Sequence, residues 1–551
     1  MTGVRRDVDV LIVGGGPGGL VSAIELGRRG IAVLLVEPRL QPDPLRPRAK
    51  TTSVRTMEHL RRLGLAGTLR AVAPLPVAYA QDVIFCTGLF GHEITRFTGA
   101  FALTTDRQEE FAESSQQVPQ PLVEQVLRTY AAGLPSVELR IGGRVTSLRD
   151  GDSTVAAEIV DRHGSPSAVT ARYAIGADGA SSISRQAIDA RYEGTSSVLP
   201  NVNITFRSTA LDPERLCGRA VHYWIVGRSL AGVMGPLDLR GTWWAIVQGV
   251  ADPAILDPVR TVRDLCGRPV DVEVLAIDPW SARTLLANRY AGRRIFLVGD
   301  AAHLNPPWGG HGFNTCVGDA VNLAWKIAAV LRGHAGPGLL ASYEIERRPV
   351  AQQTIDVAAA QETFLAPAFA KAGLDDDTEP GRQLRSQIAQ TIREAKRSEF
   401  YSLGLVLGYD YPHSPVVWPE PRVAAAASSS AFTPSAHPGA RLPHAWLGED
   451  RSIYDLLGAE FSIVSFGART APFLAAAARR GVSMTAIDLP RSSHLRERYG
   501  AELVLVRPDQ HVAWRGGGAS NAEQILGRAL GELQAVEEPG VSREKAEGKR
   551  D

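Results

Sequence analysis

Apolar runs and glycines alternate over the first forty residues of the chain. Residues 8–13 are β-branched or apolar except for Asp9, which predicts a parallel strand buried on both faces. After a glycine cluster, residues 20–29 have the pattern of a helix that Gly30 ends. A second apolar run, 31–36, leads directly to Glu37. These patterns predict a strand–helix–strand unit at the start of the chain.

The pattern further along the chain predicts a mixture of strands and helices. Residues 201–282 are dense in strand-forming and aromatic residues and lack a long helical period, which predicts a sheet. Elsewhere, we expect strands within 77–101 and at 136–148, 153–161, 171–177 and 294–298, and helices at 56–63, 122–132, 318–331, 339–348 and 358–397.

A break in the pattern falls at about residues 411–445. This stretch is rich in Pro, Ser and Ala and has no period, which predicts either a linker or an extended segment that wraps the surface. A fresh α/β pattern follows it. We expect strands at 461–466, 483–487, 503–506 and 512–514, helices at 471–480 and 521–533, and a charged, disordered tail.

Composition narrows the class of protein. A length of 551 residues suggests about three domains, and 44% hydrophobic with 22% charged residues is a globular balance. Lys and Arg number 60 against 59 Asp and Glu, so no excess of positive charge indicates a nucleic-acid partner. No apolar run approaches the roughly 20 residues that a membrane span needs. We therefore expect a cytoplasmic protein with no nucleic-acid or membrane partner.

The four cysteines give no sign of a metal site or a disulfide framework. Cys86, Cys217, Cys266 and Cys316 form no CxxC pair, so we expect no bound metal. None follows Cys316, so the C-terminal module cannot carry out thiol–disulfide chemistry.

The first chemical motif is Gly14-x-Gly16-x-x-Gly19, which lies between the first predicted strand and helix. Glycines at these positions allow a tight turn and close approach of a pyrophosphate, and the helix N-terminus supplies amide donors and a positive dipole end. Glu37 lies 21 residues after Gly16, where it can accept hydrogen bonds from ribose hydroxyls. The motif therefore predicts dinucleotide binding.

Two further glycine turns follow predicted strands. In the first, Asp178 and Gly179 directly follow the strand predicted for 171–177. The second runs from Gly299-Asp300 through Pro306-Pro307-Trp308 to Gly312-Phe313-Asn314. Asp300 can accept a hydrogen bond from a sugar-chain hydroxyl, and amides at a helix start suit a developing negative charge.

These three motifs, in this order and spacing, resemble those of the class A FAD-dependent aromatic hydroxylases, the para-hydroxybenzoate and phenol hydroxylase type. Four more segments resemble the family: its arginine loop, its Q-x-x-x-E-x-x-L helix, the end of its FAD domain, and the end of the thioredoxin-like domain of larger members such as the polyketide hydroxylases. These segments are 46–65, 120–127, 342–349 and 506–515.

The resemblance implies an α/β and α+β fold. It has a Rossmann-like FAD domain, an inserted and mostly antiparallel β-sheet substrate domain, and a C-terminal thioredoxin-like domain. The implied boundaries are 1–76, 104–200 and 285–400 (with its helices) for the FAD domain, 77–103 and 201–284 for the substrate domain, 401–440 for a linker, 441–535 for the thioredoxin-like domain and 536–551 for a disordered tail.

The resemblance also implies which residues bind FAD. The pyrophosphate lies on the glycine turn, the adenosine beside the second strand, and the flavin ring against the third motif. The implied cofactor-binding residues are Gly14, Gly16, Pro17, Gly18, Gly19, Glu37, Arg39, Arg48, Gln120, Val145, Asp178, Asp300, Gly312, Phe313 and Asn314.

The implied reaction is hydroxylation of an electron-rich aromatic molecule in secondary metabolism, such as antibiotic biosynthesis. A flavin C4a-hydroperoxide formed with NAD(P)H and O2 would transfer oxygen to a phenolic, polyketide-like or hydroxypyridine-like ring. Only one GxGxxG fingerprint is present, so NAD(P)H is expected to dock transiently.

Two alternatives stay open. One is other flavin chemistry on the same fold, by an epoxidase, halogenase or reductase, although the halogenase Trp-x-Trp-x-Ile-Pro pattern is absent. The other is an FAD-containing redox or interaction protein without hydroxylase turnover.

The substrate side is less well specified by the sequence. Since neighbours on a strand face opposite ways, some aromatic residues of 201–282 belong to the core and others to a pocket. We expect Trp308, Pro307, Tyr223, Trp224 and Phe97 in the pocket. No general base stands out, and the candidates are His222, Tyr223 and His311. The expected partner is a small aromatic substrate, and a homo-oligomer is compatible with the sequence.

Overall fold

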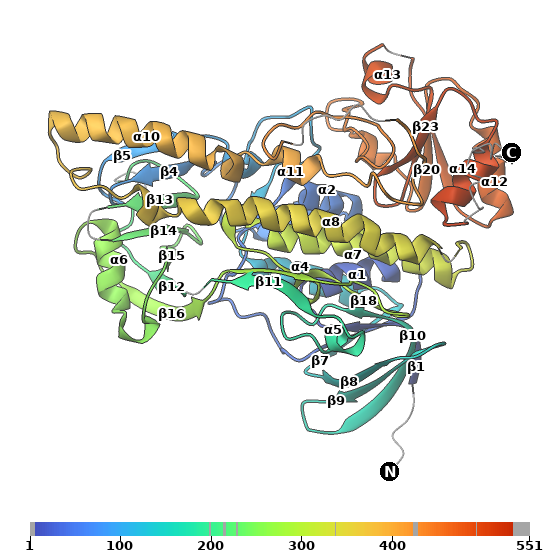
Figure 1. The fold of residues 1–551 in the computed structure, drawn as a ribbon, viewed down its shortest axis with the longest axis horizontal. Coiled ribbons are helices and arrows are strands. Elements are labelled where there is room, and N and C mark those ends of the chain that lie inside the picture. The colour runs from blue at the N-terminus through green and yellow to red at the C-terminus, as the bar shows by residue number, and fades with distance from the viewer. Residues whose placement is uncertain are drawn as a thin grey trace, which may run out of the picture.

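The computed structural model describes residues 6–197, 200–212, 216–227, 230–336, 338–421, 428–491 and 493–532 (Figure 1). The tail predicted for 536–551 lies outside the described residues.

A mostly parallel sheet forms the first layer, and its order is β7-β2-β1-β10-β9-β8, with β18 also paired to β10. The pairs β1–β2, β2–β7, β1–β10 and β10–β18 are parallel. All five residues of β2 are buried, which explains its unbroken apolar run. The strands are β1 Arg6–Val13, β2 Val33–Glu37, β7 Val137–Ile141, β8 Arg144–Asp150, β9 Val155–Val160, β10 Pro166–Gly176 and β18 Ile295–Leu297.

Helices cover this sheet and extend away from it. Helix α1 (Pro17–Gly27) packs against α7 (Gly312–Leu331) and α4 (Gln120–Ala132). Helix α7 starts six residues before the predicted position, so its first turn contains the last three residues of the third motif, Gly312-Phe313-Asn314. The long helix α8 (Gly338–Ala360) runs across the middle of the molecule (Figure 1). Shorter helices are α2 Val54–Leu63, α3 Ala66–Val72 and α5 Ile183–Ala187.

The helical region predicted for 358–397 is divided into several helices, of which three begin after α8 ends. These are the 3-10 helix η6 (Gln361–Phe364), α9 (Ala366–Phe369) and α10 (Glu379–Phe400). Gly373 has a φ of +90°, which a helix does not allow, and the Thr378 side chain caps the start of α10. No helix within the described ranges is both long enough and apolar enough to cross a bilayer.

A second sheet is inserted between strands of the first and has the order β16-β12-β15-β14-β13-β4-β5. All its pairs are antiparallel except β4–β13. A short helix, α6 (Pro258–Cys266), lies within this region and was not predicted. The strands are β4 Val83–Cys86, β5 Glu93–Phe97, β12 Asn201–Arg207, β13 His222–Val226, β14 Ala231–Pro236, β15 Thr242–Val247 and β16 Glu273–Trp280.

Two small sheets connect these layers. They are formed by β11 (Tyr192–Ser196), β17 (Arg283–Ala287) and β19 (His303–Leu304), and by β3 (Thr51–Thr52) with β6 (Gln116–Gln117).

The C-terminal domain has a four-stranded sheet in the order β21-β20-β22-β23. Its strands match the predicted ones closely, and helix α13 (Ser493–Tyr499) is an addition. The elements are β20 Phe461–Ser465, α12 Ala471–Arg479, β21 Met484–Asp488, β22 Leu503–Val506, β23 Val512–Gly516 and α14 Ala522–Ala529.

The segment that precedes this domain packs on the rest of the protein. A short helix, α11 (Leu403–Leu407), leads into this segment, 411–445, in which Tyr411, Val416 and Ala436 are buried. Of the two predicted alternatives, the described part of this segment is therefore the extended wrap.

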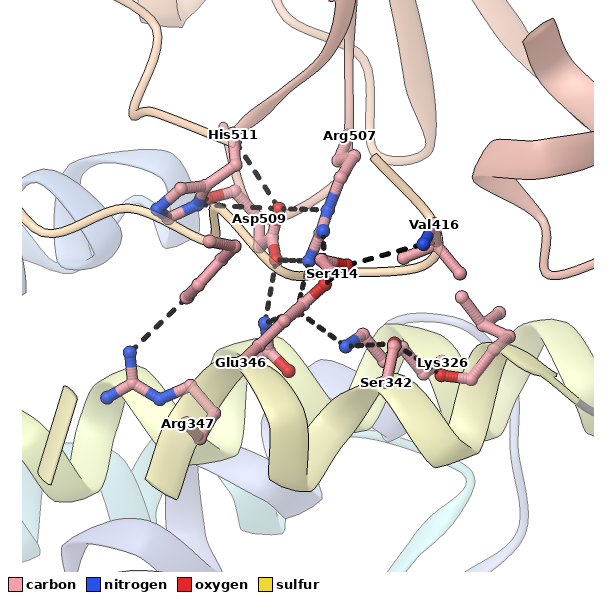
Figure 2. A network of polar contacts seen from close by, with 12 residues as sticks. Lys326, Ser342, Glu346, Arg347, Ser414, Val416, Arg507, Asp509 and His511 are labelled. Carbon is pink, nitrogen blue, oxygen red and sulfur yellow. Dashed lines mark hydrogen bonds and ion pairs between the residues drawn. The ribbon is translucent and has the colours of Figure 1, made fainter. Parts of the chain in front are cut away.

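A buried network of charged side chains joins α8 to the C-terminal domain (Figure 2). Arg507 donates two hydrogen bonds, of 2.7 and 2.8 Å, to the Glu346 carboxylate, and a third of 2.6 Å to Asp509. Lys326 on α7 and Ser414 in the wrap each donate to Glu346 at 2.6 Å. Since buried charges need partners, the paired arrangement holds these segments in one relative position.

Glu346→Gln should destabilise the protein strongly, because it removes the negative charge that Arg507 and Lys326 share. We expect a loss of about 3 kcal/mol or more in the free energy of unfolding, measured by urea denaturation. Glu273→Gln breaks an exposed pair with Arg207 and should cost less than about 1 kcal/mol. If both variants lost the same free energy of unfolding, the buried network would not be a major source of stability.

Candidate functional site

A cavity of about 890 Å3 lies between the parallel sheet and the inserted sheet. The glycine turn after β1 lines it, and so do Trp224 and Trp244 of the inserted sheet. The cavity brings together most of the residues predicted from the motifs, namely Gly14, Gly16, Pro17, Gly18, Glu37, Arg39, Arg48, Gln120, Val145, Asp178, Asp300, Gly312 and Phe313, together with His222, Trp224, Pro307, Trp308 and His311.

The glycine turn is open at Gly16, where a ligand can approach, and closely packed against the backbone at Gly14 and Gly19. Gly14 has a φ of +103°, and a Cβ there would lie 2.3 Å from the carbonyl oxygen of Ala177. A Cβ on Gly19 would lie 2.0 Å from the Gly14 carbonyl oxygen, so Gly19 serves the close packing of the turn and does not line the cavity. A Cβ on Gly16 would meet nothing within 4 Å.

The start of α1 is suited to an anion. No side chain caps it, and its first turn contains no acidic residue. The first amides of a helix lack partners within the helix and attract phosphate groups. The turn therefore fits the pyrophosphate of a dinucleotide.

A polar cluster lies beside the turn. Glu37 accepts a hydrogen bond of 2.6 Å from the Gly15 N–H and bonds of 2.9 and 2.8 Å from the backbone and side chain of Arg39. Gln120 donates to Glu124 at 2.8 Å, and Arg39 lies 3.4 Å from the same carboxylate. Glu124 was not among the predicted site residues, although its spacing of four from Gln120 on a helix was a usable signal.

The two aspartates of the glycine turns have different surroundings. Asp178 accepts hydrogen bonds from the Ser182 hydroxyl at 2.6 Å and from the Ser184 N–H at 3.0 Å, which holds its turn in shape. Desolvation raises the pKa of Asp300, whose side chain lines the cavity and makes no hydrogen bond to another described residue. A ligand hydroxyl would give Asp300 a hydrogen-bond donor.

A buried triad supports the loop that follows Asp300. His303 Nε2 donates to Asp319 at 2.9 Å, and Arg347 donates to the other oxygen of Asp319 at 2.9 Å. Burial works to lower the pKa of His303, but the Asp319 carboxylate outweighs it and the pKa is raised. The protonated ring then donates from Nδ1 to Asn305 at 2.6 Å.

Two residues predicted for the pocket do not line the cavity. Tyr223 faces the opposite side of the inserted sheet, beside Trp243, and its hydroxyl donates to the Gly218 carbonyl at 2.6 Å. Strand alternation explains this, because His222 and Trp224 on either side of it face the cavity. Phe97 is buried in the core against Phe400, with ring centroids 4.8 Å apart.

Asn314 does not line the main cavity either. Its side chain accepts hydrogen bonds from the Ser53 N–H at 2.9 Å and the Thr56 hydroxyl at 2.7 Å. It also donates to the Gly310 carbonyl at 2.8 Å. Asn314 thus ties the loop before α7 to the start of α2.

None of the predicted base candidates is tuned for proton abstraction near neutral pH. Burial and the nearby Lys50 lower the pKa of His222 to about 3, and burial lowers the pKa of His311 to about 4. Burial raises the pKa of Tyr223, which lies outside the cavity. A general base works best when its pKa lies near the working pH, so neutral imidazoles are the form expected here.

Several lining residues were missed at the level of sequence. Lys50, Gln248 and Arg283 all contribute to the cavity wall. Lys50 lies two positions after Arg48, which was predicted. The chain has only six lysines, so a lysine next to a predicted site residue was a usable signal. Gln248 and Arg283 carried no recognisable pattern.

His303→Gln should lower thermal stability more at pH 6 than at pH 9. The stabilisation that comes from a raised histidine pKa is complete below the ordinary value of 6.5 and is lost as the pH rises through the higher folded-state pKa. We expect the fall in Tm to be larger at pH 6 by about 2 °C or more. His163→Gln, at an exposed turn, is the control. A loss that is the same at both pH values would show that His303 is not charged in the folded protein.

Comparison with known proteins identifies the two main parts of the chain. Residues 7–358 match the FAD binding domain family, and residues 435–533 match the family described as aromatic-ring hydroxylase, C-terminal. An FAD-dependent monooxygenase, apdD of Emericella nidulans, is 31% identical over 95% of this chain and 90% of its own. Aklavinone 12-hydroxylase DnrF of Streptomyces peucetius is 32% identical over 82% of this chain and 90% of its own.

Solved structures extend the likeness to three dimensions. The rebeccamycin biosynthetic enzyme RebC with reduced flavin has a TM-score of 0.87 and 34% identity, covering 96% of this chain and all of that one. Aklavinone-11 hydroxylase with FAD and aklavinone has a TM-score of 0.82 and 28% identity, covering 95% and 98%. The predicted cofactor, FAD, and the predicted α/β and α+β architecture are confirmed. The chain belongs to the FAD-dependent aromatic hydroxylases.

Proposed function

We propose that this enzyme inserts one oxygen atom of O2 into the ring of a small, electron-rich aromatic substrate, of phenolic, polyketide-like or hydroxypyridine-like type. NAD(P)H supplies two electrons, and the second oxygen atom leaves as water. Relatives named as phenol and aklavinone hydroxylases support this class of substrate. A place in secondary metabolism agrees with the names of DnrF and RebC.

The observation that carries this proposal is the single cavity shared by the two sheets. Its volume of about 890 Å3 includes both the phosphate-binding turn and a wall of aromatic side chains. When bound, FAD supplies the redox chemistry that activates O2. A cofactor held on the parallel sheet would thus share one enclosure with a ring held on the inserted sheet.

In this proposal, chain residues bind and orient the cofactor. Amides of the turn at Gly14–Gly18 would hold its phosphates, Glu37 its adenosine ribose, and Asp300 the hydroxyls of its ribityl chain. Amides at the start of α7 would stabilise negative charge on the flavin ring.

Other residues shape the substrate half and exclude water. Trp308 is 6% exposed, and Trp224 and Trp244 are 3% and 2% exposed, although all three line the cavity. A dry, aromatic wall protects a reactive oxygen species from decay to hydrogen peroxide. The base that removes a ring proton is not assigned to any of the three predicted candidates.

Oxygen incorporation tests the reaction directly. The purified flavoprotein is incubated with NAD(P)H and a panel of phenols and hydroxylated polycyclic aromatics under 18O2, and products are analysed by mass spectrometry. We expect an aromatic compound to stimulate NAD(P)H oxidation and to gain one labelled hydroxyl oxygen. A halogenated, epoxidised or merely reduced product would favour the alternative flavin chemistries. A flavoprotein that no aromatic stimulates would favour a redox or interaction role.

Gly16→Ala should cause loss of FAD without loss of fold. The added Cβ meets no protein atom within 4 Å, so it interferes only with a ligand that approaches the turn. We expect FAD affinity to fall about tenfold or more, measured as flavin per chain and by fluorescence titration. Gly67→Ala in α3, which also meets nothing within 4 Å, is the matched control and should keep its flavin. Full FAD occupancy in Gly16→Ala would contradict the proposed position of the pyrophosphate.

A further inference from the structure

Lys50 is a cation at the substrate side of the cavity. Its ammonium lies 4.2 Å from the centroid of the Trp244 ring, on strand β15 of the inserted sheet. It donates one hydrogen bond, of 3.2 Å, to the Arg48 carbonyl. The His222 ring also packs against Trp244 in a T-shaped arrangement, with ring centroids 5.0 Å apart. Lys50 is thus positioned by the substrate sheet and faces an imidazole.

Lys50 has no anionic partner within the described part of the chain. Lys50 is half-buried, whereas Lys326 and Lys396 are fully buried and each pair with a glutamate at 2.6 Å. No carboxylate among the described residues lies within 4 Å of the Lys50 ammonium, and burial lowers its pKa to about 8. A desolvated cation without a counter-ion is costly, and contact with an aromatic face offsets only part of that cost.

The surrounding wall has unused hydrogen-bond donors. The indole N–H groups of Trp224 and Trp308 have no partner among the described residues. The same holds for Nε2 of Gln248, whose Oε1 already accepts from the Ala366 N–H at 3.1 Å. That bond fixes the orientation of the amide and leaves its NH2 as a donor. The one carboxylate of α10 that lines the cavity, Glu399, is engaged by Lys396.

We propose that Lys50 binds an anionic oxygen of the aromatic substrate, a phenolate, enolate or carboxylate, as the counter-ion that this ammonium lacks among the described residues. The unpartnered donors of Trp224, Trp308 and Gln248 suit further oxygen acceptors on the same molecule. Lys50 then sets specificity, because it selects aromatic compounds that carry a negative charge. This inference rests on the proposed function, since it assigns the ring to this half of the cavity.

The test compares a charged probe with its neutral twin on the FAD-loaded enzyme. The probes are 1-hydroxy-2-naphthoate and its methyl ester, and binding is measured by flavin absorbance changes and calorimetry without NAD(P)H. We expect the wild type to prefer the acid. In Lys50→Met, affinity for the acid should fall about tenfold or more while affinity for the ester changes less than about threefold. Lys50→Arg should keep the preference.

Lys371→Met removes an exposed lysine and is the control for a general charge effect. A wild type that does not distinguish the two probes overturns the proposal, and so does a Lys50→Met variant that keeps the preference. Loss of FAD from Lys50→Met would assign Lys50 to the cofactor and also overturn it. Oxygen incorporation is measured separately, so its failure alongside an intact charge preference would refute only the proposed function.

Discussion

The bidentate ion pair between Arg507 and Glu346 is the contact on which the arrangement of the whole molecule depends. Both side chains are fully buried, and Lys326, Ser414 and Asp509 complete their hydrogen bonds. Moving the C-terminal domain would leave buried charges without partners, at a cost that far exceeds that of an exposed pair. The next residue on α8, Arg347, pairs with Asp319 under the cavity loop. Helix α8 therefore connects the contact with the C-terminal domain to the loop that lines the cavity.

The C-terminal domain also supports part of the cavity wall. Arg55 on α2 donates to Gln510 at 2.6 Å and to the Asp509 carbonyl at 2.9 Å, and Arg441 pairs with Glu58 at 2.6 Å. Helix α2 follows the loop of Arg48 and Lys50 directly. Through these contacts the domain holds the segment that leads from the two cavity residues into α2.

The cavity combines two environments with different chemistry. Toward the parallel sheet, backbone amides and paired carboxylates suit phosphates and sugar hydroxyls. Toward the inserted sheet, indole rings, neutral imidazoles and one unpaired ammonium suit an oxygenated aromatic ring. The change in character follows from the two sheets. Turns at the carboxyl ends of parallel strands expose backbone, while the face of an antiparallel sheet exposes alternate side chains.

The sequence by itself determined the parallel sheet, the glycine turn and the family, because apolar runs and glycine spacings are local consequences of backbone geometry. It also determined that Trp243 and Trp244 face opposite ways, but not which of them faces the cavity. Only the tertiary structure decided that Trp224 and His222 line it while Tyr223 and Phe97 belong to the core. It alone revealed that Lys50 has no counter-ion among the described residues and that Arg507 meets Glu346 across 161 residues of chain. Such pairings depend on which faces meet after packing, and no local pattern in the chain records that.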